Sequence, residues 1–259
     1  MLTFTKGVIM KITIITLILL LTNLFGTTLQ MKYVGELSLF GKVGDATMSY
    51  MNDGKNYHII VKGGGSGIVA TFTDHKQYVY ESIGRVENGM LIPDEYIGRE
   101  ISADFNKTKR YVFDYKNSKT TVITDRSKKK EVSTFNIISF KHDVSSKILK
   151  EHSEKVLNKV YKDDMVSMFF NKRLQLLAMA KHDVKIVHAV GSKDTEGGMA
   201  VKLIAVNGGK YTYSIRIQKD YLSGGSEDAT FILDANNILH ETKLAGIMFF
   251  GDARVRRLY

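Results

Sequence analysis

The sequence predicts a mainly β fold made of antiparallel strands. Apolar and polar residues alternate with a period of two through most of the chain, which is the pattern of strands that bury one face. Glycine and asparagine clusters separate these stretches, and only two segments show helical spacing. On the order of ten or more such strands at short spacing are typical of an antiparallel sheet.

The strands are expected where the alternation is clearest, and the turns where glycine or asparagine gathers. In chain order the stretches are KYVGELSLF (32–40), YHIIVK (57–62), GIVATFT (67–73), QYVYESI (77–83), RYVFDY (110–115), TTVIT (120–124), DVKIVHAV (183–190), GMAVKLIAV (198–206), YTYSIRIQ (211–218), TFILD (230–234) and ILHETKL (238–244). Turns are expected at 52–54, 207–209 and 235–237. In YTYSIRIQ, one face carries Tyr211, Tyr213, Ile215 and Ile217, and we interpret it as an inward face that could meet a ligand.

The stretch GRVENGMLIPDEY (84–96) contains Pro93, the only proline of the chain. Asn88 and Gly89 predict a two-residue hairpin turn, so the next strand should start at Met90. Because proline has no N–H to donate, Pro93 should lie at a sheet edge or at a bulge, with a break in pairing near residues 92–95.

Two segments are candidates for helix. In KDDMVSMFFNKRLQLL (162–177), Asp163 or Asp164 can cap a first turn, which predicts a short buried helix from Met165 to Leu177. SSKILKEHSEKVLNKV (145–160) is weakly amphipathic and fits either a surface helix or an extended excursion. The polar stretch 141–162 could divide the chain into two β-rich halves.

The N-terminus predicts export. Met10 and Lys11 precede fourteen mostly apolar residues (12–25), followed by Gly26, Thr27 and Thr28. This run is shorter than the roughly 20 residues that a transmembrane helix needs. We therefore expect a signal peptide over residues 1–28, a mature domain over 29–259 located in the periplasm or peripheral to the envelope membranes, and no integral membrane segment after cleavage.

The chain has a net positive charge, and its expected export limits which partners this charge can indicate. Removing the first 30 residues takes away Lys6 and Lys11 and no acid, which lowers the formal charge from +10 to +8. Since an exported protein does not meet nucleic acid, the expected partners are anionic lipid head groups or acidic glycans, with a solvated lysine surface as the alternative. Lys128, Lys129 and Lys130 are expected to decorate a hairpin tip.

No cofactor is predicted. The chain has no cysteine, which excludes thiol chemistry and cysteine-ligated metals. VKGGGSGIV (61–69) lacks the lysine and hydroxyl spacing of a phosphate loop and is expected to lead into a strand. Ser66 and Ser226 sit in glycine-rich turns without a recognisable base.

No catalytic or metal-binding residue is assigned either. His182 and His188 could share a strand face beside Asp183, but further ligands are missing from the pattern. Asp163–Asp164 and Glu227–Asp228 are neighbours that point in different directions, so capping or turn roles are expected for them.

Five segments together resemble a family of exported bacterial proteins, the domain-of-unknown-function family numbered 3108, in its epsilonproteobacterial version. They are LFGKVGDATMSY (39–50), SIGRVENGMLIPDEY (82–96), RYVFDYKNSKTTV (110–122), DDMVSMFFNKR (163–173) and SEDATFILDANNILHETKLAGIMFFGDARVRR (226–257). The resemblance implies an exported, mainly β protein of the Gram-negative envelope without known catalytic residues. Residues and resemblance together predict a strongly curved antiparallel sheet or incomplete barrel, either single or in two halves, with one or two short helices.

Three functions fit these expectations. The first is non-enzymatic binding of a hydrophobic or anionic amphiphilic ligand, or envelope maintenance, on a concave apolar face. The second is a structural module that docks an envelope protein or peptidoglycan through sheet edges or through Arg254, Arg256 and Arg257. The third is a hydrolase whose site is assembled from distant residues.

Overall fold

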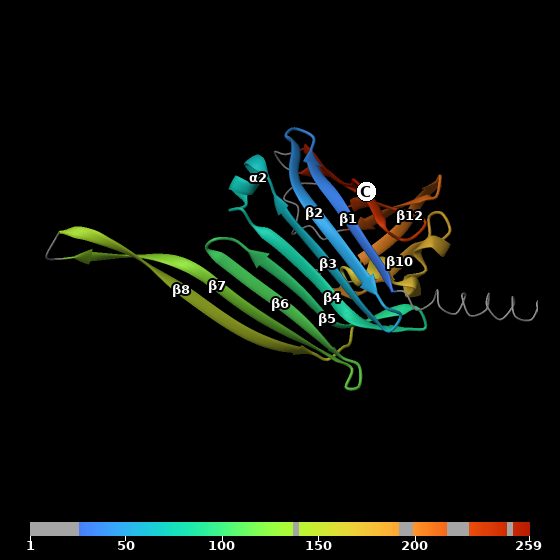
Figure 1. Ribbon diagram of the computed structural model, residues 1–259, viewed down its shortest axis with the longest axis horizontal. Helices are drawn as coiled ribbons and strands as arrows, with labels where there is room; N and C mark the ends of the chain where they lie inside the picture. The colour runs from blue at the N-terminus through green and yellow to red at the C-terminus, as the bar shows by residue number, and fades with distance from the viewer. Residues whose placement is uncertain (1–25, 137–139, 192–198, 217–227, 248–250) are drawn as a thin grey trace, which may run out of the picture.

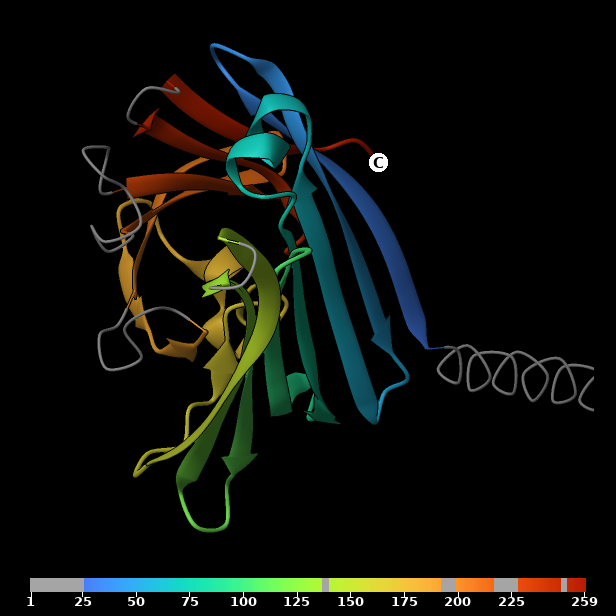
Figure 2. The same ribbon diagram turned by 90° about the vertical axis from the view of Figure 1, so that its left-hand side faces the viewer.

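The protein is an open, strongly curved antiparallel sheet, as the sequence predicts (Figures 1 and 2). The computed structural model describes residues 26–136, 140–191, 199–216, 228–247 and 251–259. The sheet has 14 strands, with β8 and β10 as its two edges. The expected signal peptide falls outside the described residues except for 26–28, of which Thr27 and Thr28 begin the first strand.

The chain builds the sheet in two runs, the first outward from its centre and the second from the opposite edge back to the centre. The first run is β1 (Thr27–Leu37), β2 (Gly41–Asn52), β3 (Asn56–Gly65), β4 (Gln77–Glu87), β5 (Met90–Ile101), β6 (Phe105–Asp114), β7 (Lys119–Asn136) and β8 (Lys141–Leu157). The second run starts at the opposite edge with β10 (Val184–Val187), followed by β12 (Met199–Asn207), β13 (Lys210–Arg216), β14 (Asp228–Leu233), β15 (Leu239–Ile247) and β16 (Gly251–Arg257). β1 pairs with both β2 and β16, so the first and last strands join the two runs into one sheet.

Residues 161–190, called the inner segment below, cross from one edge of the sheet to the other over its concave face. They contain β9 (Asp163–Asp164), three 3₁₀ helices η2 (Ser167–Phe169), η3 (Lys172–Leu174) and η4 (Leu176–Ala178), the edge strand β10, and β11 (Ala189–Val190), which pairs with β9 in parallel. The segment is buried as expected, but the single helix predicted over 165–177 is wrong. Gln175 adopts the left-handed conformation at φ 48°, which separates η3 from η4 and prevents a continuous helix.

The turn chemistry of GRVENGMLIPDEY is confirmed. Asn88 and Gly89 have φ values of 52° and 74°, as a tight turn between β4 and β5 requires. Ile83 pairs with Glu95 and Gly84 with Pro93, which leaves Asp94 as the extra residue of a bulge. Proline therefore occupies the place where the ladder is already interrupted.

Three local predictions are wrong. GIVATFT forms the helix α2 (Gly67–Phe72) instead of a strand, because Gly67 at φ 57° turns the chain out of β3 and Thr73 closes the turn by donating its hydroxyl to Val69 O at 2.8 Å. The 128–130 lysines lie within β7 and not at a hairpin tip, because β7 and β8 are 18 and 17 residues long. The stretch 183–190 is broken at His188, where the chain leaves the β10 ladder and enters the β9–β11 pair. Of the two alternatives for 145–160, most of the stretch is extended and belongs to β8.

The hydrophobic core lies between the concave face of the sheet and the inner segment. One cluster joins Met168, Leu174, Leu176 and Met179 to the inward residues of β12–β14. A second joins Tyr161, Val166 and Val190 to the inward residues of β3 and β5–β7. A smaller third cluster lies under β1 and holds Met31, Tyr33 and Ile238. The inner segment thus fills part of the concavity with side chains.

Candidate functional site

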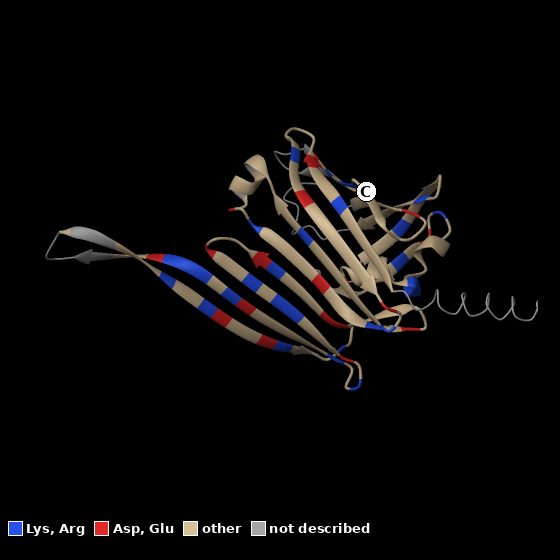
Figure 3. Ribbon diagram, viewed as in Figure 1, with Lys and Arg blue, Asp and Glu red and all other residues tan. Residues whose placement is uncertain are grey.

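Part of the concave face remains exposed and is basic. Tyr111 on β6 and Val122 on β7 are buried on the concave face, and they lie directly opposite each other in the ladder. Residues an even number of positions from Tyr111 and Val122 along these strands share the concave face. Among them are Lys107 and Lys109 on β6, and Arg126 and Lys128 on β7, called the basic patch below. Figure 3 shows that β6, β7 and β8 carry many of the cations of the described chain.

Lys109 is the more buried of the two basic-patch lysines, Lys109 and Lys128, that have no carboxylate partner among the described residues. Its side chain is half-buried, and Nζ lies 5.0 Å from the centre of the Tyr111 ring. Among the described residues it has no carboxylate partner, whereas Lys107 lies 3.9 Å from Glu100 and Arg126 lies 3.5 Å from Glu151. Burial lowers the pKa of Lys109 below its usual value, as expected for a cation that has lost water without gaining an anion.

Aromatic and aliphatic side chains lie beside the basic patch. The Phe105 ring has Lys76 Nζ 5.1 Å from its centre and Arg126 Cζ 5.3 Å from it. The Tyr80 side chain is 36% exposed, and its ring lies 3.5 Å from the position that a Cβ on Gly98 would occupy. Leu149, which pairs with Lys128, is 40% exposed. Cations and accessible apolar surface are therefore interleaved on one face.

A fully buried hydrogen-bond network holds the inner segment on the sheet. The carboxylate of Asp164 accepts from Ser82 Oγ at 2.6 Å and from Ser167 Oγ at 2.8 Å. Its other oxygen accepts the backbone N–H groups of Val166 and Ser167, both at 2.8 Å. Since the Ser82 hydroxyl donates to Asp164, it must accept from Tyr57 Oη, which lies 3.0 Å away. Burial raises the pKa of Tyr57 far above its usual range and that of Asp164 above its own.

The neighbouring carboxylate completes this attachment. Asp163 accepts from Asn171 Nδ2 at 2.8 Å and forms an ion pair with Arg173. Asn171 also exchanges hydrogen bonds with the backbone of Leu91 on β5, at 2.9 and 3.3 Å. Of the capping or turn roles expected for the Asp163–Asp164 pair, the turn role is confirmed for Asp164, whose carboxylate accepts the backbone N–H groups of Val166 and Ser167 at the start of η2. Sequence reasoning missed the anchoring role, although the polar residues of DDMVSMFFN inside an apolar segment were a signal for it.

The residues predicted to face a ligand lie in the filled part of the concavity. Tyr213 and Ile215 are 1% and 3% exposed and pack in the cluster that contains Met168 and Leu176. Tyr211 is partly buried against the same cluster, and Ile217 lies outside the described residues. A ligand could reach Tyr213 or Ile215 only by displacing the inner segment.

The described histidines do not assemble a recognisable catalytic or metal site. His58 pairs with Glu81 at 3.2 Å on the convex face, and Glu81 also pairs with Arg99. His152 pairs with Asp125 at 2.7 Å on the exposed hairpin. Within the described residues no three His, Asp or Glu side chains are grouped so that they could hold a metal ion.

The other sequence candidates for chemistry have these positions. His182 lies at φ 74° before β10, so the strand face it was expected to share with His188 is absent. Ser66 precedes α2, whose six residues are too few for an anion-binding helix terminus, and the lysine and hydroxyl spacing of a phosphate loop is still missing. Ser226 and the side chains of Glu227 and Asp228 lie outside the described residues.

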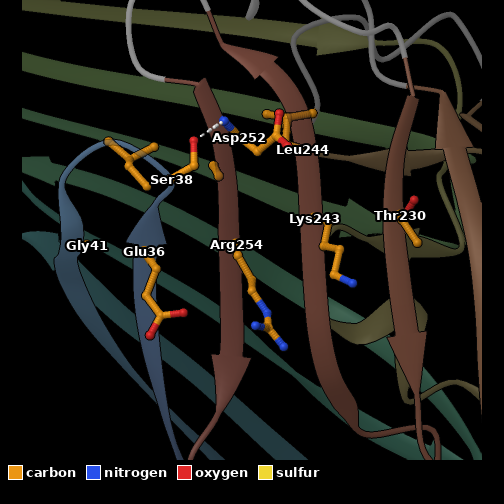
Figure 4. Close-up of a pocket in the computed structure, with 10 residues that line it drawn as sticks. Glu36, Ser38, Gly41, Thr230, Lys243, Leu244, Asp252 and Arg254 are labelled. Carbon is orange, nitrogen blue, oxygen red and sulfur yellow. Dashed lines mark hydrogen bonds between the residues drawn. The ribbon is translucent and has the colours of Figure 1, made fainter.

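A shallow pocket of ≈ 760 Å³ lies on the convex face across β14, β15, β16 and β1 (Figure 4). Its cations are neutralised by carboxylates nearby. Arg254 and Lys243 lie 2.7 and 3.0 Å from Glu241. The two arginines that follow along β16 are paired as well, Arg256 with Glu36 at 3.0 Å and Arg257 with Asp234 at 2.9 Å. The pocket therefore offers less uncompensated charge than the basic patch.

Fold and site define a class of protein: an open, curved antiparallel sheet whose concave face is part core and part exposed basic surface. Residues 28–143 match the family described as protein of unknown function (DUF3108), which confirms the resemblance over that part of the chain. The similar segments at 163–173 and 226–257 lie beyond the matched residues, and the epsilonproteobacterial version stays a prediction. No curated protein and no solved structure matches the chain. In the described residues no helix is both long and apolar enough to cross a membrane.

Proposed function

We propose that this protein is a non-enzymatic binding protein of the bacterial envelope that holds an anionic amphiphile on the basic patch. The observation that carries the proposal is Lys109, a half-buried cation on the concave face without a carboxylate partner among the described residues. A buried charge of this kind is costly unless an opposite charge meets it. An anionic head group at Lys109 would supply that charge.

The surroundings of Lys109 favour an amphiphile over a small inorganic anion. Tyr80 and Leu149 offer accessible apolar surface on the same face. Arg126 and Phe105 stack at the other side of the patch, where Lys76 adds a further cation. An acyl chain or another apolar group could lie against these side chains while its head group contacts Lys109.

The cellular setting is part of the proposal. The apolar run 12–25 behind Lys11 favours export, and the absence of cysteine fits a compartment in which free thiols are at risk. Anionic amphiphiles in that compartment are the phospholipids and related lipids of the envelope. A protein with an exposed basic face could carry or sense such a molecule.

Calorimetric titration with monomeric lysophosphatidylglycerol tests the proposal, with lysophosphatidylcholine as the zwitterionic comparison. We expect the wild-type protein to prefer the anionic lipid. Lys109→Met should weaken its binding at least tenfold, because a charge-assisted hydrogen bond contributes about 1.5–3 kcal/mol and 1.4 kcal/mol corresponds to about tenfold.

The matched control is Lys62→Met, which removes an exposed lysine from the convex face of β3. It should leave the affinity unchanged. Equal affinity of wild type and Lys109→Met for the anionic lipid, or equal affinity of wild type for both lipids, would refute the proposal.

A further inference from the structure

The β7–β8 hairpin projects beyond the rest of the sheet (Figure 1). The ladder between β6 and β7 ends where Phe105 pairs with Lys128. Beyond that point residues 129–136 pair only with 141–148, and we call this two-stranded extension the ribbon. Isolated two-stranded ribbons are marginally stable in water because both faces are solvated.

Lysines gather at the base of the ribbon, and exposed apolar side chains are described nearer to its tip. Four lysines lie at its base, called the collar below: Lys129, Lys130, Lys147 and Lys150. Toward the tip follow Val132 and Val144, which are 38% and 65% exposed, and Phe140, which is 79% exposed. Between the collar and the tip, the structure describes one carboxylate side chain, that of Glu131. Ile148, which is 64% exposed, lies beside the collar. Among the side chains that the structure describes, the ribbon thus has a basic base and an apolar end, although the sequence also has Lys141, His142 and Asp143 near the tip.

The cross-strand pairs change character where the ribbon begins. Alongside the sheet, Arg126 pairs with Glu151 and Asp125 with His152, which are favourable combinations. In the ribbon, Lys130 pairs directly with Lys147, although like charges opposite each other destabilise a sheet. Neither lysine has a carboxylate partner among the described residues. An external anionic surface would relieve this repulsion.

We propose that the ribbon docks obliquely on an anionic lipid bilayer, with the collar at the head groups and Val132, Phe140 and Val144 in the interface. Val132 lies two residues beyond Lys130, a distance of roughly 7 Å at about 3.3 Å per residue. This lies within the depth of about 5–10 Å to which interfacial segments bury their apolar side. Phe140 lies beyond the last pair of the ladder, Asn136 with Lys141, which is six residues or roughly 20 Å from Lys130. The ribbon must therefore lie obliquely to the membrane for Phe140 to stay at that depth. The proposal does not depend on the basic patch, since the collar and the patch share no residue.

Flotation with vesicles of 30% phosphatidylglycerol in phosphatidylcholine tests the collar. The double variant Lys130→Ala/Lys147→Ala should bind these vesicles roughly 30-fold more weakly, because each lysine near an anionic surface contributes about 1 kcal/mol. The control Lys62→Ala/Lys202→Ala removes two exposed strand lysines away from the ribbon and should bind like wild type. Wild-type binding should fall with added salt and be absent on pure phosphatidylcholine.

Tryptophan fluorescence tests the tip, because the chain has no tryptophan of its own. In Phe140→Trp, the anionic vesicles should shift the emission to the blue, and lipids brominated on their acyl chains should quench it. Leu39→Trp is the matched control, since Leu39 is 68% exposed in the β1–β2 turn. Its emission should not change.

Three results would overturn the proposal. The first is wild-type affinity of the collar variant for the vesicles, and the second is an unchanged emission of Phe140→Trp on bound vesicles. The third is collar-dependent binding of soluble polyglutamate by a protein that does not float with vesicles, which would assign the ribbon to an acidic polymer. The outcome is separable from that of the proposed function, because Lys109→Met should float like wild type and the collar variant should still bind monomeric lysophosphatidylglycerol.

Discussion

Replacing Asp164 by alanine should strongly destabilise the fold, because this carboxylate is the acceptor for four hydrogen bonds in a site without solvent. Asp164 and Ser82 are both 0% exposed. The substitution leaves the hydroxyls of Ser82 and Ser167 and two backbone N–H groups without their acceptor. It also removes the contact through which the inner segment is held on β4.

The magnitude follows from the donors left unpaired. Each buried donor without a partner costs about 1–3 kcal/mol, and breaking a buried charged cluster costs about 3–5 kcal/mol in total because the single contributions do not add. We expect about 4 kcal/mol for Asp164→Ala. Ser82→Ala removes one of the four bonds and leaves Tyr57 Oη without its acceptor, so about 1–3 kcal/mol is expected.

Urea unfolding followed by far-UV circular dichroism measures these changes in the free energy of unfolding. The control is Asp104→Ala, which removes an exposed carboxylate 3.4 Å from Lys129 and should change stability by less than about 1 kcal/mol. A loss for Asp164→Ala no larger than that of the control would refute the anchoring role of the network.

Three further predictions concern backbone space and charge. Gly84→Ala should destabilise the fold by several kcal/mol, roughly as overpacking does, because the new Cβ would overlap Ile92 O and lie 2.8 Å from Pro93 Cα. The control is Gly89→Ala, whose Cβ would have no atom within 4 Å. In the same urea assay it should cost only about 1 kcal/mol, because Gly89 has a positive φ. Burial alone would raise the pKa of Glu241, but hydrogen bonds from neighbouring cations outweigh it and lower that pKa. Its ionised form therefore stabilises the fold above the unfolded pKa, and the stability difference between wild type and Glu241→Gln should shrink as the pH falls below about 4; a constant difference from pH 7 to 3 would contradict this. Since burial lowers the pKa of Lys109, the affinity for lysophosphatidylglycerol should decline already below pH 10.5, and a flat titration profile up to that pH would count against its role.

Local patterns were sufficient to predict much of the sheet. The alternation in YTYSIRIQ and the turns at 207–209 and 235–237 reappear as β13 and its neighbouring hairpins, because residues that set φ act within the turn itself. The bulge opposite Gly84 was also predictable from a local property, because Pro93 has no backbone N–H to donate to a neighbouring strand.

Features that depend on distant residues were not predictable in this way. The spacing of Met165, Met168 and Phe169 fits a helix, but hydrogen bonds with Ser82 and Leu91, about 80 positions away, hold this stretch in short turns. The face of the Tyr213 strand was predicted correctly, whereas its covering by the inner segment depends on the path of another part of the chain. The basic patch had a local signal: Lys107 and Lys109 precede Tyr111 with the period of two that marks one face.

The network around Asp164 also decides where the open part of the concave face begins. On β4, Ser82 is 0% exposed beneath the inner segment, and Tyr80, two residues along the same face, is 36% exposed. The same boundary crosses β6, where buried Tyr111 is followed on its face by half-buried Lys109. The polar anchor therefore fixes the edge of the inner segment one side chain away from the unpaired cation. Because Lys109 lies at this edge, it is buried enough to lose water but open enough to meet an anion, and the anchor is a structural condition for the proposed binding.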